Sequence, residues 1–419
     1  MNIWKDTYPL IISCARGLVP QTTKELLRLG FKIIDSTENT VVVRGGMRDM
    51  MTLNLQLRTA HRVLVPLLRT QCGNLRFFYN DIASIEWENL LEPDGYFTVN
   101  SVVHNDTIRD TRLPSLTAKD AIVDRMRDHC GGRPDSGRET IGAAVFIYWQ
   151  DNELIVYIDT TGEPLSKRGY RKLPGSAPMQ ETLAAGCILA SDWDANTPFI
   201  SPMCGSGTPA IEAVLLALNR APGSFKSHFA FMALKGYRLT IPGERAGTSV
   251  RQRFGASPEL IWKDMVATAR AQERRVNMPQ IIATDISPEA VETAQMNAIA
   301  AGVSEHITFG VCDFAATKLP PPPGVIFMNP EYGERLGADK DLEPLYRRIG
   351  DFLKQKCIGY KGCILTGNME MSRKIGLRSS QRVPFFNGPI ECRMVVFDLY
   401  EGRQTEEEPS AEDDLMSDG

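Results

Sequence analysis

The stretch that decides the fold is FISPMCGSGTPAIEAVLLA, residues 199–217. A short apolar strand runs into a loop with two glycines, and a helical pattern then begins with a proline, a residue suited to the first turn of a helix. Glycines let the backbone approach a ligand closely, and the amide groups that open the helix face such a ligand. The same GxGxxA string also fits a dinucleotide site or a plain tight turn. The pattern predicts a nucleotide-type ligand contacted by Pro202, Cys204, Gly205, Gly207 and Thr208.

The region from residue 179 onward alternates between helical patterns and short apolar runs. The runs are FIS, IIATD, ITFGVCD, VIFMNP and GCILTG, and the helices include one from Pro288 and one near residues 343–354. This alternation predicts an α/β fold with a parallel sheet and helices on both faces, in which residues 219–278 form an insertion with helices of its own. Near the end of the chain, Asn387-Gly388 predicts a terminal hairpin.

Two aspartates follow successive strands of this predicted sheet. Asp285 ends IIATD, where a carboxylate can accept both hydroxyls of a ribose, although it also suits a helix cap. It lies 78 residues beyond Gly207, whereas a dinucleotide fold places its acid about 20 residues on, so an NAD site is disfavoured. Asp313 ends ITFGVCD and is a candidate partner for an adenine amine, with a turn aspartate as the alternative.

Asn329, Pro330 and Tyr332 follow the apolar strand VIFM and predict chemistry on a base amine. The lone pair of such an amine is delocalised into the ring, so catalysis requires acceptors that hold its two N–H bonds while the nitrogen attacks a methyl donor. The Asn329 side-chain oxygen and the Pro330 carbonyl can supply both, and Tyr332 would stack on the base. By itself, an Asn-Pro turn is common at strand ends, but here it follows the glycine loop and both aspartates in order.

The N-terminal part of the chain predicts two small α+β units. Residues 9–14, 19–29, 31–34 and 40–44 have strand, helix, strand and strand patterns, and a second α+β region extends to residue 160. Residues 161–178 are rich in Gly, Pro and cations and predict a connector. This connector is either a solvated linker or a loop that contacts phosphates. In the second case the contacts would come from Lys167, Arg168 and Arg171, with Tyr170 available for stacking.

Composition narrows the class of protein. A chain of 419 residues with 43% hydrophobic and 23% charged residues predicts several globular domains. It has no apolar stretch of membrane-spanning length and no signal peptide, so a cytosolic location is expected. The nine cysteines are scattered without CxxC pairs, which predicts reduced thiols and no metal site. Residues 401–419 are acidic and predict a disordered tail, which leaves a mildly basic body.

Several motifs together resemble a known family, the THUMP-containing class I methyltransferases that make N2-methylguanosine in RNA. The likeness covers roughly residues 1–400, and the bacterial large-subunit ribosomal RNA enzymes are the nearest in pattern. It rests on the glycine loop and on residues 15–18 (ARGL), 119–125 (KDAIVDR), 167–171 (KRGYR), 177–185 (APMQETLAA), 329–336 (NPEYGERL) and 387–392 (NGPIEC).

The resemblance implies a ferredoxin-like module (1–60), a THUMP RNA-binding domain (61–160), a linker (161–178) and a Rossmann-like methyltransferase domain (179–400). S-adenosylmethionine would contact the glycine loop, Asp285, Asp313 and Asn329, and no metal is implied. Lys119 and Arg125 join the candidate RNA contacts. One departure stands out, because Glu331 occupies the place of a second proline and is expected to influence base preference.

Four alternatives stay open at this point. The Asn-Pro-x-Tyr turn is shared with adenine-N6 nucleic-acid methyltransferases, and transfer RNA is an equally accessible substrate for this architecture. A catalytically silent RNA-binding protein would tolerate Glu331. An oxidoreductase would use the glycine loop for NAD.

Overall fold

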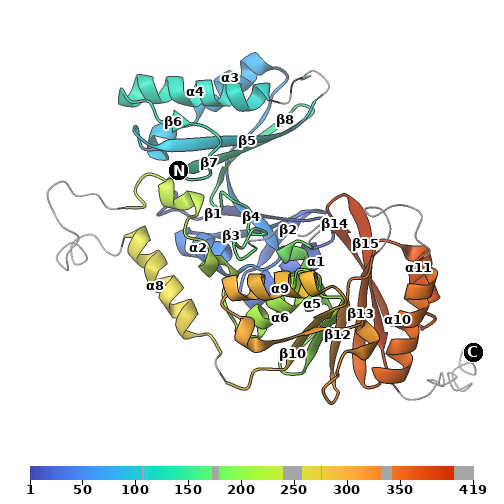
Figure 1. Cartoon of the computed structure of the whole chain (residues 1–419). Coiled ribbons are helices and arrows are strands. Elements are labelled where there is room, and N and C mark those ends of the chain that lie inside the picture. Colours follow the sequence, from blue (N-terminus) through green and yellow to red (C-terminus); the bar gives the residue numbers. More distant parts are fainter. Residues whose placement is uncertain are drawn as a thin grey trace, which may run out of the picture.

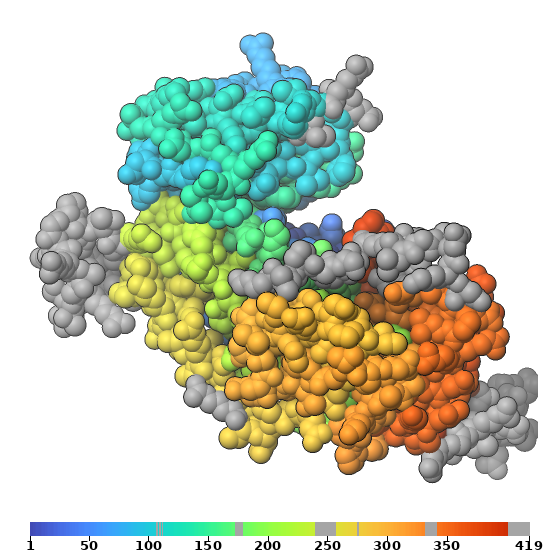
Figure 2. Space-filling model, in the orientation of Figure 1, coloured from blue at the N-terminus to red at the C-terminus, as the bar shows by residue number. Residues whose placement is uncertain are grey.

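The computed structural model describes residues 1–105, 108, 110, 112–171, 179–238, 257–274, 276–331 and 342–400. Its strands form two sheets, one of eight strands in the N-terminal part and one of seven in the C-terminal part (Figure 1). Figure 2 shows the second N-terminal unit, coloured cyan to teal, as a lobe above the rest of the chain. The predicted tail, 401–419, lies outside the described residues.

The N-terminal sheet has the order β2-β3-β1-β4-β8-β7-β5-β6. Strand β4 pairs with β1 on one side and with β8 on the other, so both predicted units share one sheet. The first unit contains β1 (Tyr8–Cys14), α1 (Val19–Arg28), β2 (Ile33–Ser36), β3 (Thr40–Gly45) and α2 (Met47–Gln56), and β4 (Ala60–Gln71) leads out of it. The second contains α3 (Leu75–Ser84), η1 (Trp87–Asn89), β5 (Tyr96–His104), α4 (Leu113–Cys130), β6 (Asp135–Ser136), β7 (Ala143–Gln150) and β8 (Glu153–Asp159).

Alternating burial explains why these segments form strands. In β1, Leu10 and Ile12 are fully buried and their neighbours are not, as expected for a strand with one face on a core. In the second unit, Phe78 of α3 stacks on Trp149 of β7 at a centroid distance of 5.0 Å. Helices α3 and α4 therefore cover one face of this part of the sheet (Figure 1).

The C-terminal sheet has the order β11-β10-β9-β12-β13-β15-β14, with β15 antiparallel to β13 and the central strands parallel. The order reverses at β9, the switch point at which open α/β sheets bind ligands. The C-terminal part of the chain contains α5 (Glu181–Ala190), β9 (Phe199–Pro202), α6 (Thr208–Ala217), η2 (Pro222–Phe225), η3 (Ala230–Ala233), α8 (Pro258–Ala271), β10 (Ile281–Asp285), α9 (Pro288–Ala300), η4 (Ser304–His306), β11 (Ile307–Val311), η5 (Phe314–Ala316), β12 (Gly324–Met328), α10 (Glu343–Lys356), β13 (Tyr360–Thr366), α11 (Met369–Lys374), β14 (Gln381–Asn387) and β15 (Ile390–Asp398).

Two hydrophobic cores lie on opposite faces of this sheet. Phe199 and Phe327 belong to the core beneath α5, α6 and α9, whereas the adjacent residues Ile200 and Ile326 belong to the core beneath α10 and α11. Figure 1 shows these two sets of helices on either side of the strands. The predicted parallel sheet with helices on both faces is confirmed, as are the terminal hairpin and the helix inserted between residues 219 and 278, which is α8.

The first N-terminal unit packs closely against the C-terminal domain. A Cβ on Gly17 would lie 2.9 Å from the Pro384 carbonyl oxygen of β14, and one on Gly186 of α5 would lie 2.2 Å from Leu18. Deeper in the same contact, Arg58 donates to the backbone oxygens of Leu215 and Arg220. These approaches fix the unit against both the terminal hairpin and the first helices of the domain.

Candidate active site

The predicted site residues meet at one edge of the C-terminal sheet. Thr284 lies opposite Pro202 and Ile326 lies opposite Ile200 in the strand registers. Continuing these registers places Asp285 and Asn329 on either side of Met203, with Cα atoms about 10 Å apart at the usual strand spacing. The glycine loop, the first aspartate and the Asn-Pro turn are thus neighbours, as the sequence predicts.

The glycine loop is held by its neighbours on both sides. Cys204 N donates to Thr284 O at 2.9 Å, and Gly205 N donates to Asp285 Oδ2 at 2.9 Å. On the other side, Asn297 of α9 is 1% exposed and donates through Nδ2 to Ser206 O at 3.1 Å. Asn297 is not among the residues predicted from the sequence, where its signal is a polar side chain on the buried face of a helix.

The two glycines of the loop are required for different physical reasons. Gly207 has φ +80°, and a Cβ there would lie 2.8 Å from the Ala294 Cβ, so it permits close packing of the loop on α9. Gly205 has φ +52°, and a Cβ there would meet no atom within 4 Å. Open space above Gly205, beside a carboxylate and at the switch point of the sheet, is a place where the backbone can approach a ligand.

The two predicted cofactor aspartates have different surroundings. Asp285 accepts from Gly205 N through one oxygen and from Ser287 N through the other, which leaves further lone pairs for a ribose. Asp313 accepts from Arg348 at 2.8 and 2.9 Å and from Ala315 N. Partial burial raises the pKa of Asp313. Its hydrogen bonds to Arg348 and to the Ala315 amide, together with the Arg348 charge, lower the pKa by more, so that the net effect is a decrease. No local pattern around Asp313 predicts its pairing with Arg348, which lies 35 residues further along the chain.

The side-chain oxygen of Asn329 is a hydrogen-bond acceptor that no donor among the described residues reaches. Its Oδ1 atom is buried and has no hydrogen-bond partner among the described residues, and the adjacent Pro330 is buried. A buried polar atom without a partner costs free energy, and a ligand that donates a hydrogen bond to Asn329 Oδ1 would remove this cost. Glu331 is exposed, and its carbonyl oxygen accepts from Tyr346 Oη at 3.3 Å. Tyr332 lies outside the described residues.

Cys204 and Thr208, also predicted to contact the cofactor, are both buried, and their cofactor role stays a prediction. Burial, followed by the charge of Asp285 and the proximity of Cys312, raises the pKa of the Cys204 thiol to about 12. A protonated thiol is a poor nucleophile, in line with its interpretation as a small loop residue. Thr208 is 2% exposed, and its hydroxyl accepts from Arg171 at 3.2 Å.

Two of the predicted RNA contacts are wrong because their side chains are buried. Arg168 and Tyr170 are each 1% exposed. Arg168 pairs with Glu212 of α6 and donates to Arg58 O and Leu165 O, and Tyr170 donates to Glu212 at 3.0 Å. Neither a phosphate nor a base can reach them, so this part of the connector joins domains instead of binding RNA.

The other predicted RNA contacts retain more exposure, and their RNA role stays a prediction. Lys167 is exposed and pairs with Glu163, while Arg171 donates to Met179 O and pairs with Glu181. In the second unit, Lys119 donates to Gly137 O. Arg125 makes a two-pronged ion pair with Glu88 and also donates to Ala83 O, so most of its donors are already used.

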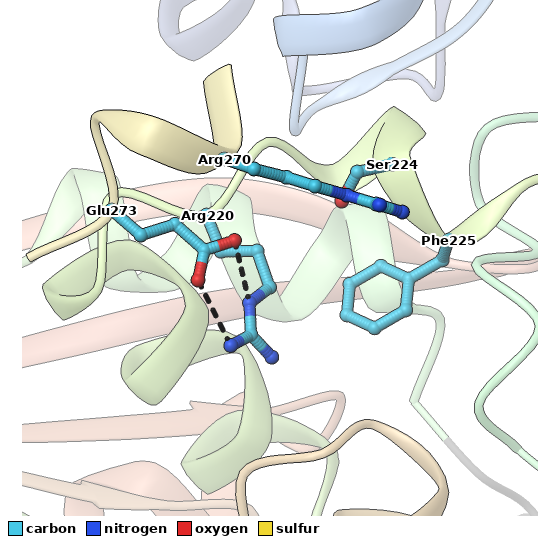
Figure 3. Close-up of a pocket in the computed structure, with 5 residues that line it drawn as sticks. All are labelled: Arg220, Ser224, Phe225, Arg270 and Glu273. Atoms are coloured by element: carbon cyan, nitrogen blue, oxygen red, sulfur yellow. Dashed lines mark hydrogen bonds and ion pairs between the residues drawn. The ribbon is translucent and has the colours of Figure 1, made fainter. Parts of the chain in front are cut away.

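A separate hollow of about 340 Å³ lies at the opposite edge of the sheet, beyond the C-terminal end of α6. Figure 3 shows its lining, in which both Glu273 oxygens bind Arg220 and Arg270 extends towards Ser224 and Phe225. Arg220 also donates to Ala301 O and Gly302 O. The Arg220 guanidinium therefore links the residues after α8 and α9, and the hollow is remote from the glycine loop.

The residues at the catalytic edge fit S-adenosylmethionine. The open space above Gly205 admits the ligand against the backbone, and Asp285 can accept ribose hydroxyls. Asn329, with its buried oxygen, follows β12, the strand that pairs with β9 ahead of the glycine loop. Within the described ranges, no group of three His, Cys, Asp or Glu side chains could hold a metal ion. Over the same ranges, no helix is both long and apolar enough to cross a bilayer.

Comparisons with known proteins agree with this geometry. The chain matches an RlmL ferredoxin-like domain over residues 9–64, a THUMP domain over 74–159 and an RMKL-like methyltransferase domain over 168–396. In structure it is similar to SMU.472, described as a methyltransferase and solved with SAH, with a TM-score of 0.80 and 26% identity over 96% of this chain and all of the other. Fold and site together define a class I, S-adenosylmethionine-dependent RNA methyltransferase. The chain belongs to the RMKL-like methyltransferase family.

Two relatives show how far the likeness extends. Protein slr0064 of Synechocystis, named as an RNA methyltransferase, is 30% identical over 94% of this chain and 97% of its own length. The ribosomal RNA large subunit methyltransferase K/L of Magnetococcus marinus is 32% identical over 93% of this chain, but this chain spans only 53% of that enzyme. The likeness to the K/L enzyme therefore concerns about half of that protein.

Proposed function

We propose that this chain transfers a methyl group to the exocyclic N2 amine of a guanosine in large-subunit ribosomal RNA, in the cytoplasm. The observation that carries the proposal is the buried Oδ1 of Asn329, which has no hydrogen-bond partner among the described residues and follows β12, the strand next to β9 and its glycine loop. The relatives named as K/L enzymes support the choice of RNA. The THUMP match supports an RNA substrate in general.

Methyl transfer to an amine requires hydrogen-bond acceptors for its N–H groups more than it requires a general base. S-adenosylmethionine supplies an electrophilic methyl carbon. The Asn329 oxygen and the Pro330 carbonyl accept the two N–H bonds of the amine and direct its lone pair at that carbon. As the new C–N bond forms, the C–S electron pair returns to sulfur, and the surplus proton leaves the nitrogen for water. Holding the two reactants in line can contribute roughly 7–11 kcal/mol.

The base must be taken out of its helix to reach this site. Extrusion costs a few kcal/mol, and stacking on one aromatic ring returns about 1–3 kcal/mol, the role proposed for Tyr332. Glu331 replaces a proline found in related turns, but the Asn329 and Pro330 acceptors are both present. We therefore expect amine methylation to persist, with Glu331 affecting the choice of base.

The test uses the purified chain, labelled S-adenosylmethionine and four substrates: unmodified large-subunit ribosomal RNA, small-subunit ribosomal RNA, transfer RNA and DNA. Nucleoside analysis should find label in N2-methylguanosine from the first substrate. Label only in transfer RNA, or only as N6-methyladenine in DNA, would replace the proposal with one of its rivals. No label on any substrate, together with NAD binding by calorimetry, would favour an oxidoreductase.

A variant pair tests the role of the amide oxygen. Asn329→Ala should lower transfer at least 100-fold, by analogy with the loss of one oriented polar group at other active sites, and should leave S-adenosylmethionine affinity within a few-fold. Asn89→Ala, an exposed asparagine of the second unit, is the matched control and should keep full activity. Equal turnover of both variants would remove Asn329 from the mechanism.

A further inference from the structure

Three of the sequence motifs that carry the family likeness meet in space around a pocket outside the cofactor loop. The pocket has a volume of about 390 Å³, in the range of small-ligand sites. Among the described residues, its lining comes from the first N-terminal unit, the residue before α5 and the turn of the terminal hairpin: Ala15, Arg16, His61, Gln180, Phe386, Gly388 and Pro389.

The pocket lies at the catalytic edge of the sheet. Met328 is opposite Ile364, Thr366 is opposite Arg393, and Arg393 is opposite Pro384. The hairpin therefore continues past the level of Pro330, and Phe386 stands beyond the edge from which Asn329 projects. Strand spacings put the two residues on the order of 15 Å apart, a distance that a few nucleotides of RNA can span.

The walls of the pocket are already in position. Gly17, next to Arg16, adopts φ +86°, and a Cβ there would lie 3.0 Å from the Phe385 Cα. The first unit and the hairpin thus touch backbone to backbone immediately beside the pocket. Binding of a ligand would therefore carry no free-energy cost for bringing these two parts of the chain together.

The side chains that line the pocket match the parts of a nucleotide. The Arg16 guanidinium lies 4.7 Å from the centre of the Phe386 ring, and both kinds of plane stack on unpaired bases. The Arg16 side chain is 61% exposed, and the ion pair that it makes with Glu38 at 3.3 Å is exposed as well and therefore weak. No carboxylate is among the described lining residues, and the Glu38 that pairs with Arg16 is itself largely exposed, so a phosphate can take the place of this weak contact.

His61 adds a neutral polar group to the wall. Burial, with the charges of Arg62 and Arg168, lowers its pKa to about 4 in spite of a hydrogen bond with Gln180, and its Nε2 lies 3.3 Å from Thr182 Oγ1. A neutral imidazole and the Gln180 amide can exchange hydrogen bonds with a base edge without adding charge.

We propose that this pocket binds an unpaired nucleotide of the substrate RNA next to the methylated guanosine, with its phosphate on Arg16 and its base on Phe386. The proposal rests on the proposed function, because it takes RNA as the substrate. It assigns to the domain junction the task of holding the strand beside the extruded base.

The test measures binding of the full chain to an unmodified large-subunit ribosomal RNA transcript across a series of salt concentrations. Arg16→Ala should weaken binding about 5–10-fold and reduce the slope of log affinity against log salt by about 0.7, the value for one phosphate of a single strand. Phe386→Leu keeps an apolar side chain but removes the flat ring, so affinity should fall at least 5-fold with an unchanged slope. Both variants should bind S-adenosylmethionine normally.

Arg28→Ala is the matched control, because Arg28 is an exposed arginine of the same unit at the far end of α1. If Arg16→Ala and Phe386→Leu match this control in affinity and slope, the pocket does not bind RNA. If all three variants lose the same slope, the effect is general charge and the proposal is also overturned. Methylation of the same transcript by the unaltered chain is measured in parallel, and its absence would count against the proposed function instead.

Discussion

Arg168 and Glu212 form a buried ion pair between the connector and helix α6, with Nε and Oε1 3.4 Å apart and side chains 1% and 0% exposed. Glu212 also accepts the Tyr170 hydroxyl, and Arg168 donates to Arg58 O in the first N-terminal unit. One pair therefore joins three parts of the chain that are far apart in sequence.

Removing either member of this pair should be costly. Arg168→Ala or Glu212→Ala leaves an uncompensated buried charge, so each should lower the free energy of unfolding by about 3–5 kcal/mol in urea titrations. The double variant Arg168→Met with Glu212→Leu should be less destabilised than either alanine variant. Additive losses would mean that the pair does not act as a unit.

The two loop glycines should respond differently to alanine. Gly207→Ala should reduce both stability and cofactor affinity, because its Cβ would overlap Ala294. Gly205→Ala should weaken S-adenosylmethionine binding at least 10-fold at a stability cost of only about 1 kcal/mol. Gly30→Ala, with φ +87° and no neighbour within 4 Å, is the control, since it should cost similar stability without touching cofactor affinity. Isothermal titration and thermal melting measure the two effects.

The Asp285 carboxylate has two tasks, to hold the loop and to bind the ribose. Asp285→Ala should raise the dissociation constant for S-adenosylmethionine about 10–100-fold and lower stability by about 1–3 kcal/mol, since the Gly205 and Ser287 amides lose a charged acceptor. Asp194→Ala removes a comparable turn aspartate, which accepts from the Asn196 and Thr197 amides. It should share the stability loss and retain the affinity; a matching loss of affinity would point to indirect effects.

Stability should depend on pH through His61. Its folded pKa of about 4 lies below the unfolded value of about 6.5, so the unfolded chain binds the proton first as pH falls. The contribution of the neutral ring is complete above pH 6.5 and is lost between 6.5 and 4, by about 3 kcal/mol in all. His61→Gln should therefore gain stability relative to the unaltered chain between these pH values, whereas His104→Gln, an exposed control, should not. Parallel unfolding curves for His61→Gln and the unaltered chain across this range would contradict the assignment.

Much of the catalytic edge could be predicted because its signals are local. Gly205, Asp285 and Asn329 each lie at the end of a short strand or within three residues after it, and parallel strands bring their carboxyl ends to one edge. The partners of these residues were not predictable in the same way. Asn297 and Arg348 belong to helices whose packing against the loops is a long-range property.

The same distinction explains the errors in the connector. Arg168 and Tyr170 lie in a Gly- and cation-rich segment without periodicity, which indicates solvent exposure. Their partners, Arg58 and Glu212, are separated from them by more than 40 residues, so no local pattern shows the burial. The shared eight-stranded sheet was equally hidden, since the pairing of β4 with β8 joins segments about 90 residues apart.

That shared sheet has a mechanical consequence. Strand β4 runs from the first unit into the second with a register shift against β8, between Pro66 and Leu68, so bending between the units would break ladder hydrogen bonds on either side of this shift. The first unit also packs against the terminal hairpin. The THUMP lobe and the catalytic edge are then held at a fixed separation. We therefore expect this enzyme to select RNA by the span between the part held by the THUMP lobe and the extruded nucleotide, so that a target base at another separation is methylated poorly.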